Sequence, residues 1–217
     1  MPSTTSGAAA GGPTPPRAAP APLDALTADN SALFLIDYQE RMYKGVGDRD
    51  RNQMHRAAVA AAKAAAIMEI PTVLTLINAQ WNGDFNAEVA APFPGQEVIA
   101  RTVPGFDALA DPAVDAALRA TGRRKIVLSG LWTSICMSFT ALHVLREGYE
   151  VYGIVDAAGD VSREAHDTGV TRMAQAGVVP LTWMPLVSEW MADWSNPASG
   201  ALHDQVYATY DIMMSMP

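Results

Sequence analysis

The sequence predicts an α/β protein with a three-layer α/β/α arrangement around a six-stranded, mostly parallel β-sheet. Its 217 residues, 49% of them hydrophobic and 18% charged, are enough for one domain with a sizeable core. Six short apolar runs alternate with helix-like segments, which is typical of a parallel sheet covered on both faces. The first run, 32–36, is uninterrupted, as expected of a strand buried on both faces.

The first half of the chain contains three predicted strands and one long helix. The first strand ends at Asp37, and an alanine-rich helix follows it. Ile70 and Pro71 end that helix, because the residue before a proline disfavours helical geometry. The third strand is short and ends at Arg101. The predicted ranges are strands at 32–36, 72–77 and 97–100 and a helix at 51–69.

The second half alternates helices and strands. Asp111 and Pro112 suit the cap and the first position of a helix, and Gly122 ends it. Ser162 suits the cap of a later helix, which Gly177 closes. The predicted ranges are helices at 111–121, 134–147 and 162–176, strands at 125–130, 150–155 and 178–183, and one or two final helices.

The first 22 residues differ from the rest of the chain in composition. They hold six of the 15 prolines and a single charged residue, Arg17. Such a segment buries little apolar surface, so residues 1–22 are predicted to be a disordered tail rich in Pro, Ala and Gly. The alternative is a polyproline docking arm, although no repeated Pro-x-x-Pro motif is present. Residues 23–217 are predicted to form one domain.

Composition and charge exclude several classes of protein. Cys136 is the only cysteine, which excludes intramolecular disulfides and favours a reducing compartment. The formal net charge of −8 argues against a general nucleic-acid binder, which needs a basic face. No apolar run is long enough to span a membrane, and no export signal is recognisable. We therefore expect a cytoplasmic protein that binds neither nucleic acid nor membrane.

Three residues that can carry chemistry follow the ends of predicted strands. Asp37 follows the first strand, Arg101 follows the third, and Cys136 lies near the start of the helix after the fourth. The carboxyl ends of parallel strands are where ligand sites lie. Each residue also has an ordinary structural interpretation. Asp37 is then a capping or turn carboxylate, Arg101 forms a surface salt bridge, and Cys136 is a buried structural thiol. Together they predict a proton-transfer group, an anion-stabilising charge and a nucleophile in one cleft.

The position of Cys136 favours a reactive thiol. Unpaired amides and the dipole at a helix N-terminus stabilise a thiolate, so we expect a lowered thiol pKa. The same amides can bind the oxyanion that forms during acyl transfer.

The ordered motifs resemble those of the isochorismatase-like cysteine hydrolases, and most closely their YcaC-type branch. The resemblance covers roughly residue 25 to the end of the chain. The motifs that carry it are Leu35-Ile36-Asp37-Tyr38-Gln39, Val98-Ile99-Ala100-Arg101, Gly130-Leu131-Trp132-Thr133-Ser134-Ile135-Cys136, Asp156-Ala157-Ala158-Gly159, Arg172-Met173-Ala174-Gln175-Ala176-Gly177 and Leu181-Thr182-Trp183.

The resemblance implies a Rossmann-like hydrolase fold and an Asp, Lys and Cys triad. Asp37 and Cys136 match two of these positions, whereas the lysine position falls on Arg101. Arginine keeps the positive charge but cannot shuttle a proton at neutral pH, so we expect Arg101 to stabilise charge. The resemblance also implies a cis peptide bond between Leu131 and Trp132. The amides of Trp132 and Cys136 would then form the oxyanion hole.

The expected reaction is hydrolysis of a small-molecule amide or related carbonyl compound through an acyl-enzyme on Cys136. Aromatic side chains are expected to line the substrate pocket, namely those of Phe34, Trp81 and Trp132. No metal or cofactor is predicted. The resemblance implies that superfamily members acting on nicotinamide hold a metal with histidines in the loop after the second strand, and the matching loop here, 78–85, has no histidine. The four histidines also lack metal-ligand spacing. For one of them, His166, we expect a structural or capping role.

Two other classes of function stay open. A non-enzymatic small-molecule-binding or redox-responsive protein can use the same fold. A nucleotide-dependent enzyme is disfavoured, because no Gly-x-Gly-x-x-Gly or Walker loop follows any strand. We also expect a homo-oligomer, because the helix predicted at 184–194 is unusually apolar and family members assemble.

Overall fold

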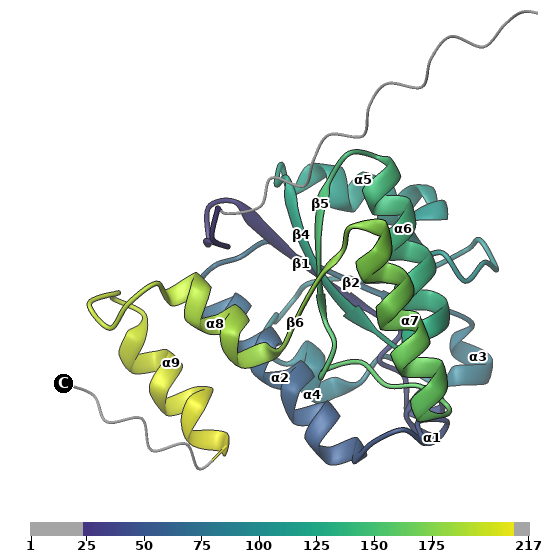
Figure 1. The fold of residues 1–217 in the computed structure, drawn as a ribbon, viewed down its shortest axis with the longest axis horizontal. Helices are drawn as coiled ribbons and strands as arrows, with labels where there is room; N and C mark the ends of the chain where they lie inside the picture. The colour runs from purple at the N-terminus through teal and green to yellow at the C-terminus, as the bar shows by residue number, and fades with distance from the viewer. Residues whose placement is uncertain (1–23, 211–217) are drawn as a thin grey trace, which may run out of the picture.

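The structure, a computed structural model, describes residues 24–210 (Figure 1). The predicted tail at 1–22 lies outside the described residues, as do the last seven residues of the predicted domain. Within the described part, no helix is long and apolar enough to cross a membrane.

The sheet has six strands in the order β3-β2-β1-β4-β5-β6. All the pairings between these strands are parallel, which confirms the predicted fold class. The chain builds outward from β1 to β3 and then returns to the other side of β1, so β1 and β4 flank the topological switch point. The strands are β1 (Ser31–Ile36), β2 (Thr72–Leu76), β3 (Val98–Ala100), β4 (Lys125–Gly130), β5 (Glu150–Ile154) and β6 (Val179–Leu181).

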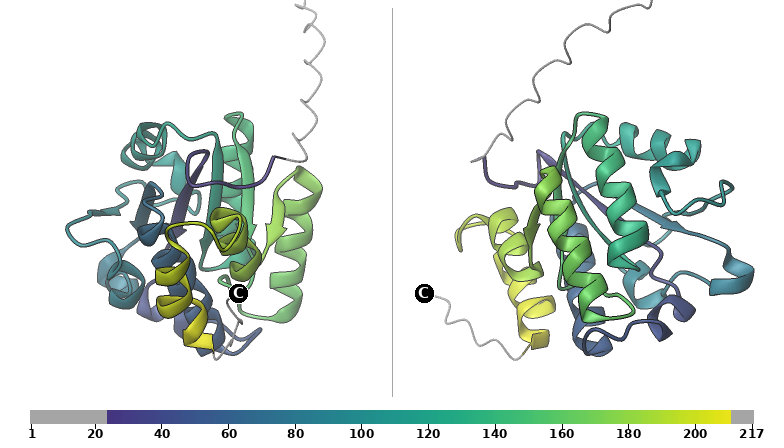
Figure 2. Two further views of the ribbon diagram at one scale, coloured as in Figure 1. Left: turned by 90° about the vertical axis from the view of Figure 1, so that its left-hand side faces the viewer. Right: turned by 45° about the vertical axis from the view of Figure 1, so that its right-hand side comes forward.

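Helices cover both faces of the sheet (Figures 1 and 2). On one face lie α2 (Arg51–Ile67) and α8 (Trp183–Met191), with α4 (Ala87–Ala90) and α9 (Ser199–Gln205) packed against α2. On the other face lie α5 (Pro112–Ala120), α6 (Ser138–Arg146) and α7 (Arg163–Ala176). Alternate residues of β1 therefore enter two separate cores, with Leu33 and Leu35 in one and Phe34 and Ile36 in the other.

The structure adds short elements that the sequence did not predict. The additions are α1 (Glu40–Lys44), α3 (Ala79–Asn82), α4 and the 3₁₀ turns η1 (Ala108–Ala110) and η3 (Tyr207–Tyr210). Each spans about one turn, which is too short for a helical period to be recognised. The helix predicted from residue 134 begins as a π-helical turn, η2 (Thr133–Met137), and continues as α6.

The apolar helix near the C-terminus has a different role from the predicted one. We expected its apolar residues to pack on another subunit. Instead, Trp183, Leu186, Val187 and Trp190 are buried within the core that α2 covers. The physical reason is that α8 lies directly on α2 and the sheet, so its apolar face is already covered within one chain.

Candidate active site

Asp37 and Arg101 form an ion pair at the carboxyl edge of the sheet. Oδ2 of Asp37 lies 2.8 Å from Nη2 of Arg101, and both side chains are fully buried. Asp37 directly follows β1, and Arg101 directly follows β3. The backbone of Asp37 has φ of 57°, in the left-handed region, while its N–H donates to Thr75 O on β2. The strand order thus brings together two residues that are 64 positions apart in the chain.

Cys136 completes the group. It lies on η2, just after β4, and only 4% of its surface is exposed. Its thiol is a hydrogen-bonding neighbour of the Asp37 carboxyl group, and the backbone amide of Trp132 also faces the sulfur. The Leu131–Trp132 peptide bond is cis, as the resemblance implied. The three residues singled out in the sequence therefore converge at one point.

The thiol is not acidic in this resting arrangement. Burial, together with the charge of Asp37, raises the pKa of the Cys136 thiol to about 12, although Arg101 and the Trp132 amide oppose that shift. The expectation of a lowered pKa is therefore wrong. Its premise was a thiol at an open helix N-terminus, whereas this thiol is desolvated and lies beside a carboxylate.

Asp37 responds to the same surroundings. Burial raises the pKa of its carboxyl group above the ordinary value, while the Arg101 guanidinium acts in the opposite direction. A carboxyl group with a raised pKa is a stronger base than an exposed one. Asp37 is thus suited to receive a proton from its neighbour Cys136.

Several polar atoms of this group have no hydrogen-bond partner of good geometry. They are Oδ1 of Asp37 and Nε and Nη1 of Arg101, all fully buried. Buried donors and acceptors are nearly always satisfied in folded proteins. Unpaired atoms from two facing side chains therefore mark a place where a bound molecule can supply the missing partners.

The three aromatic residues predicted to line the pocket are placed differently from one another. Trp132 is half-buried, and its Nε1 donates to Met42 O at 2.9 Å. Trp81 lies on α3 and is 64% exposed. Phe34 is fully buried in the same core cluster as Cys136, so it offers no exposed surface to a substrate. Of these three residues, only Trp81 and Trp132 therefore have accessible surface.

His166 has a definite partner that sequence reasoning missed. Its Nδ1 lies 2.8 Å from the hydroxyl of Thr133, at the start of the turn that carries Cys136. Asp160 is also buried and accepts the Ser134 N–H. The position of Asp160 just after the motif at 156–159 was the available signal for this contact.

No metal centre is evident in the part of the chain that the structure describes. Among residues 24–210, no group of three or more His, Cys, Asp or Glu side chains is arranged to hold a metal ion.

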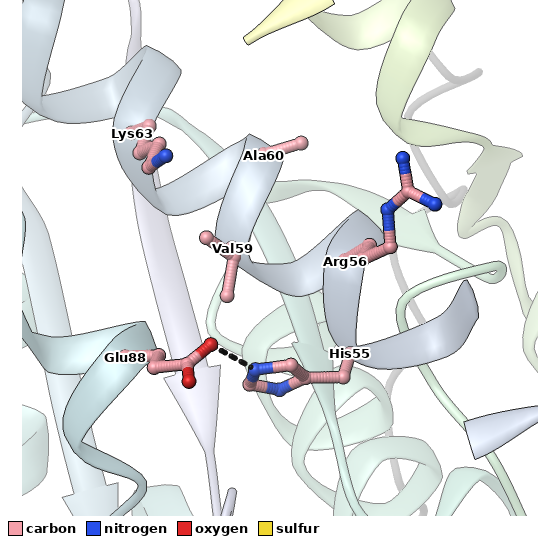
Figure 3. Close-up of a pocket in the computed structure, with 6 residues that line it drawn as sticks. All are labelled: His55, Arg56, Val59, Ala60, Lys63 and Glu88. Atoms are coloured by element: carbon pink, nitrogen blue, oxygen red, sulfur yellow. Dashed lines mark hydrogen bonds and ion pairs between the residues drawn. The ribbon is translucent and has the colours of Figure 1, made fainter. Parts of the chain in front are cut away.

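A hollow of about 80 Å³ lies elsewhere, against α2 and α4 (Figure 3). His55 bridges its two sides, because Nε2 lies 2.9 Å from Glu88 Oε2 while Nδ1 lies 2.9 Å from the Tyr43 hydroxyl. The hollow is lined by His55, Arg56, Val59, Ala60, Lys63 and Glu88. None of the predicted site residues belongs to it.

Known proteins share this arrangement of sequence and fold. The isochorismatase domain model matches residues 31–184. The probable hydrolase YcaC of Escherichia coli is 29% identical over 177 residues, which cover 81% of this chain and 84% of that protein. Isochorismatase domain-containing protein 2 of Bos taurus is 31% identical over 169 residues, covering 77% and 78% respectively.

Solved structures agree with the sequence matches. YcaC from Pseudomonas aeruginosa, described with hexane-2,5-diol and covalent acrylamide, superimposes with a TM-score of 0.81 at 27% identity, covering 86% of this chain and 94% of that one. The Escherichia coli YcaC structure, described as an octameric hydrolase of unknown specificity, gives a TM-score of 0.80 at 27% identity, with coverage of 89% and 99%. On this evidence the chain belongs to the isochorismatase family of hydrolases, in its YcaC-type branch.

Proposed function

We propose that this protein is a cysteine hydrolase that cleaves a small-molecule amide, or a related carbonyl compound, through a covalent acyl-enzyme on Cys136. The observation that carries the proposal is the convergence of Cys136 with the buried Asp37–Arg101 ion pair at the carboxyl edge of the sheet. A nucleophile beside a base that a third group holds in place is the recurring arrangement of covalent catalysis.

Acylation begins when Asp37 accepts the thiol proton as the sulfur of Cys136 attacks the carbonyl carbon. The carbonyl oxygen becomes negatively charged, and the amides of Trp132 and Cys136 donate hydrogen bonds to it. The C–N bond then breaks, and Asp37 returns the proton to the leaving amine. This step leaves a thioester on Cys136 and an ionised Asp37.

Deacylation uses the same groups in reverse. Asp37 accepts a proton from a water molecule that attacks the thioester carbonyl. The tetrahedral intermediate collapses, the C–S bond breaks, and the proton returns to the sulfur. The products are a carboxylic acid, an amine and the neutral thiol, which the raised pKa of Cys136 favours between turnovers.

Arg101 holds charge in this scheme and transfers no proton. Its guanidinium favours the ionised form of Asp37 against the opposing effect of burial, and it lowers the free energy of the transient thiolate. The unpaired Nε and Nη1 of Arg101 are also suited to bind an acceptor oxygen of the substrate. Trp81 and Trp132 supply apolar surface for the remainder of the molecule.

The test is a panel of small amides and esters, including 4-nitrophenyl acetate, assayed with the wild type and with Cys136→Ala. We expect turnover by the wild type only, and a mass increase equal to one acyl group on the peptide that contains Cys136. Asp37→Asn is expected to lose acylation, because the base is absent. Full turnover by either variant would disprove the proposed mechanism.

One observation favours a second candidate, a non-enzymatic small-molecule-binding or redox-responsive protein. The raised pKa of Cys136 describes a thiol that is mostly neutral at pH 7, as in an unreactive buried cysteine. Under this alternative, no member of the panel is turned over, although small molecules still bind in equilibrium dialysis. A chain with a single cysteine and no intramolecular disulfide is typical of a reducing compartment, so we keep the cytoplasm as the proposed location.

We also propose that the protein assembles into a homo-oligomer. The support comes from the relative, since the Escherichia coli YcaC structure is described as octameric and the two folds superimpose over 99% of that chain.

A further inference from the structure

The turn that carries Cys136 is held from behind by four buried polar side chains. We call these residues, Asp48, Thr133, Asp160 and His166, the clamp. All four side chains are at least nine-tenths buried, with side-chain exposures of 1% for Asp48 and 7% for His166. They come from the loop after α1, from η2, from the loop after β5 and from α7, and none of them was predicted as a catalytic or binding residue.

Asp160 lies at the centre of the clamp. Its Oδ2 accepts the Ser134 N–H at 2.7 Å, and its Oδ1 accepts the Val161 N–H at 2.8 Å. Its own N–H donates to Asp48 Oδ1 at 2.8 Å, and its carbonyl oxygen accepts the Gly47 N–H at 2.8 Å. One residue thereby joins the Cys136 turn to the loop that follows α1.

Thr133 and His166 form the second half of the clamp. The N–H and the hydroxyl of Thr133 both donate to Gly159 O, at 3.0 and 3.2 Å. Nδ1 of His166 meets the same hydroxyl oxygen at 2.8 Å and lies 3.7 Å from Asp48 Oδ2. Helix α7, which carries His166, is pressed against the turn, because a Cβ on Gly169 would lie only 2.8 Å from Ser134 Cα.

These contacts determine which amides of the turn are occupied. The first N–H groups of a helix have no acceptor within that helix. Here, the Thr133 and Ser134 amides are bound by the segment at 159–160. The neighbouring Trp132 amide instead faces the sulfur of Cys136. The direction of that amide therefore depends on how firmly the next two residues are held.

We propose that Asp160 and Thr133, supported by His166 and Asp48, are positioning residues that aim the Trp132 amide at the reacting carbonyl oxygen. The inference rests on the proposed acyl transfer at Cys136. It goes beyond that function because it assigns catalytic consequence to residues that touch neither the nucleophile nor the substrate. A misplacement of about 1 Å that arises from a mutation away from the reacting atoms can cost about 100-fold in rate.

The experiment compares two reactions of Cys136, which is the only thiol in the chain. In acetylation by 4-nitrophenyl acetate, the sulfur adds to the carbonyl carbon and negative charge develops on the carbonyl oxygen. The C–O bond then breaks as this intermediate collapses, and 4-nitrophenolate leaves. Alkylation by iodoacetamide displaces iodide at a saturated carbon and forms no oxyanion. Both rates are measured by mass spectrometry on the full chain. A loss of oxyanion stabilisation lowers the first rate constant selectively, whereas a change in thiol exposure affects both.

The main variant is Asp160→Asn, which keeps the shape of the side chain but leaves only one acceptor for two N–H groups. We expect the ratio of acetylation to alkylation to fall by at least about tenfold. The matched control is Asp156→Asn, a half-buried carboxylate that also accepts a backbone N–H, in this case that of Trp183 on α8. The control is expected to keep the wild-type ratio.

A second pair of variants covers the case in which Asp160→Asn does not fold. Thr133→Val removes the hydroxyl and keeps the shape, and we expect the same selective loss of acetylation. Thr133→Ser keeps the hydroxyl and should give the wild-type ratio of acetylation to alkylation. Equal losses in both reactions, or an unchanged ratio in Asp160→Asn and Thr133→Val, would overturn the clamp while leaving the proposed function intact. If the wild type is alkylated but never acetylated at Cys136, the proposed function fails, and the clamp fails with it.

Discussion

Burial of the Arg101 side chain has a large desolvation free energy, because the charged guanidinium group loses its hydration. This side chain and that of Asp37 are fully buried, and their attraction across 2.8 Å offsets this desolvation only in part. A pair of this kind stabilises a fold poorly, and well-packed apolar residues would do as well. The Asp37–Arg101 pair is therefore better explained by the chemistry proposed for the site than by stability.

The stability of an Arg101→Met variant is expected to depend on pH. Without the guanidinium, the pKa of Asp37 in the folded protein rises further, whereas its value in the unfolded chain is unchanged. The folded state then binds the Asp37 proton more tightly, so stability is kept below the unfolded pKa and lost as pH rises toward the folded pKa. We expect a loss of about 3–5 kcal/mol at neutral pH and a smaller loss near pH 4.

Urea denaturation at the two pH values tests this expectation. Arg119→Met is the matched control, because Arg119 pairs with Asp115 and Glu147 on the exposed surface. Its loss should be much smaller than that of Arg101→Met. An Arg101→Met variant with the same loss at both pH values would contradict the assignment of the penalty to an ionised Asp37.

Gly45 is expected to control the position of Trp132. A Cβ on Gly45 would lie 2.4 Å from Cζ2 of the Trp132 ring, although its φ of −78° suits any residue. Gly45→Ala should therefore displace the indole, lower the free energy of unfolding by about 1–3 kcal/mol and slow acetylation of Cys136.

Gly200→Ala is the control, because nothing lies within 4 Å of that position on α9. It should stabilise by roughly 0.5–1 kcal/mol. Urea denaturation and the acetylation rate measure both variants, and equal effects would refute the steric argument.

At the scale of the element, α2 is notable for its small side chains. Its buried residues are Met54 and the alanines 57, 58, 60, 61, 62, 64 and 65. Alanine allows the helix to lie close to the sheet and to its neighbours α8 and α9, both of which contact it. The hydrophobic contribution per residue is small, so the stability of this layer depends on dense packing of the helix against its neighbours.

Overpacking this helix should be costly. Ala61 is fully buried, so Ala61→Leu adds three carbon atoms where there is no space, and we expect a loss of about 1–3 kcal/mol or more. Ala116 lies on the exposed face of α5, and Ala116→Leu should change stability by less than about 0.5 kcal/mol. Chemical denaturation of both variants provides the comparison. A tolerated Ala61→Leu would show that the layer repacks freely.

At the scale of the whole molecule, the strand order explains the position of the site. Asp37 follows β1, Arg101 follows β3, and Cys136 lies on η2 after β4, so the three residues lie around the switch point. The helical layers on both faces leave the carboxyl edge of the sheet as the place where these strand ends converge.

Assembly is the prediction that belongs to this scale. Light scattering coupled to size-exclusion chromatography should give a mass that is a multiple of 23.1 kDa. The buried α8 argues against that helix as the contact surface, so disrupting it should unfold the subunit rather than release monomers. A single species at the monomer mass across the micromolar range would refute the proposed homo-oligomer.

The sequence by itself determined the order and type of the long elements and the residues at their ends. Uninterrupted apolar runs predicted buried parallel strands, and the end-of-strand rule then singled out Asp37, Arg101 and Cys136 before any contact was known. The predicted fold is confirmed and the three residues do lie together, because strand burial and strand-end position depend on local pattern and on topology.

Only the tertiary structure decided the electrostatics and the supporting contacts. The pKa of Cys136 is raised instead of lowered, Phe34 lies wholly in the core, α8 is covered within its own subunit, and Asp160 and His166 hold the Cys136 turn. The physical reason is common to all four findings. Desolvation and side-chain contact depend on segments that are far apart in the chain, and no local sequence pattern records which of them will meet.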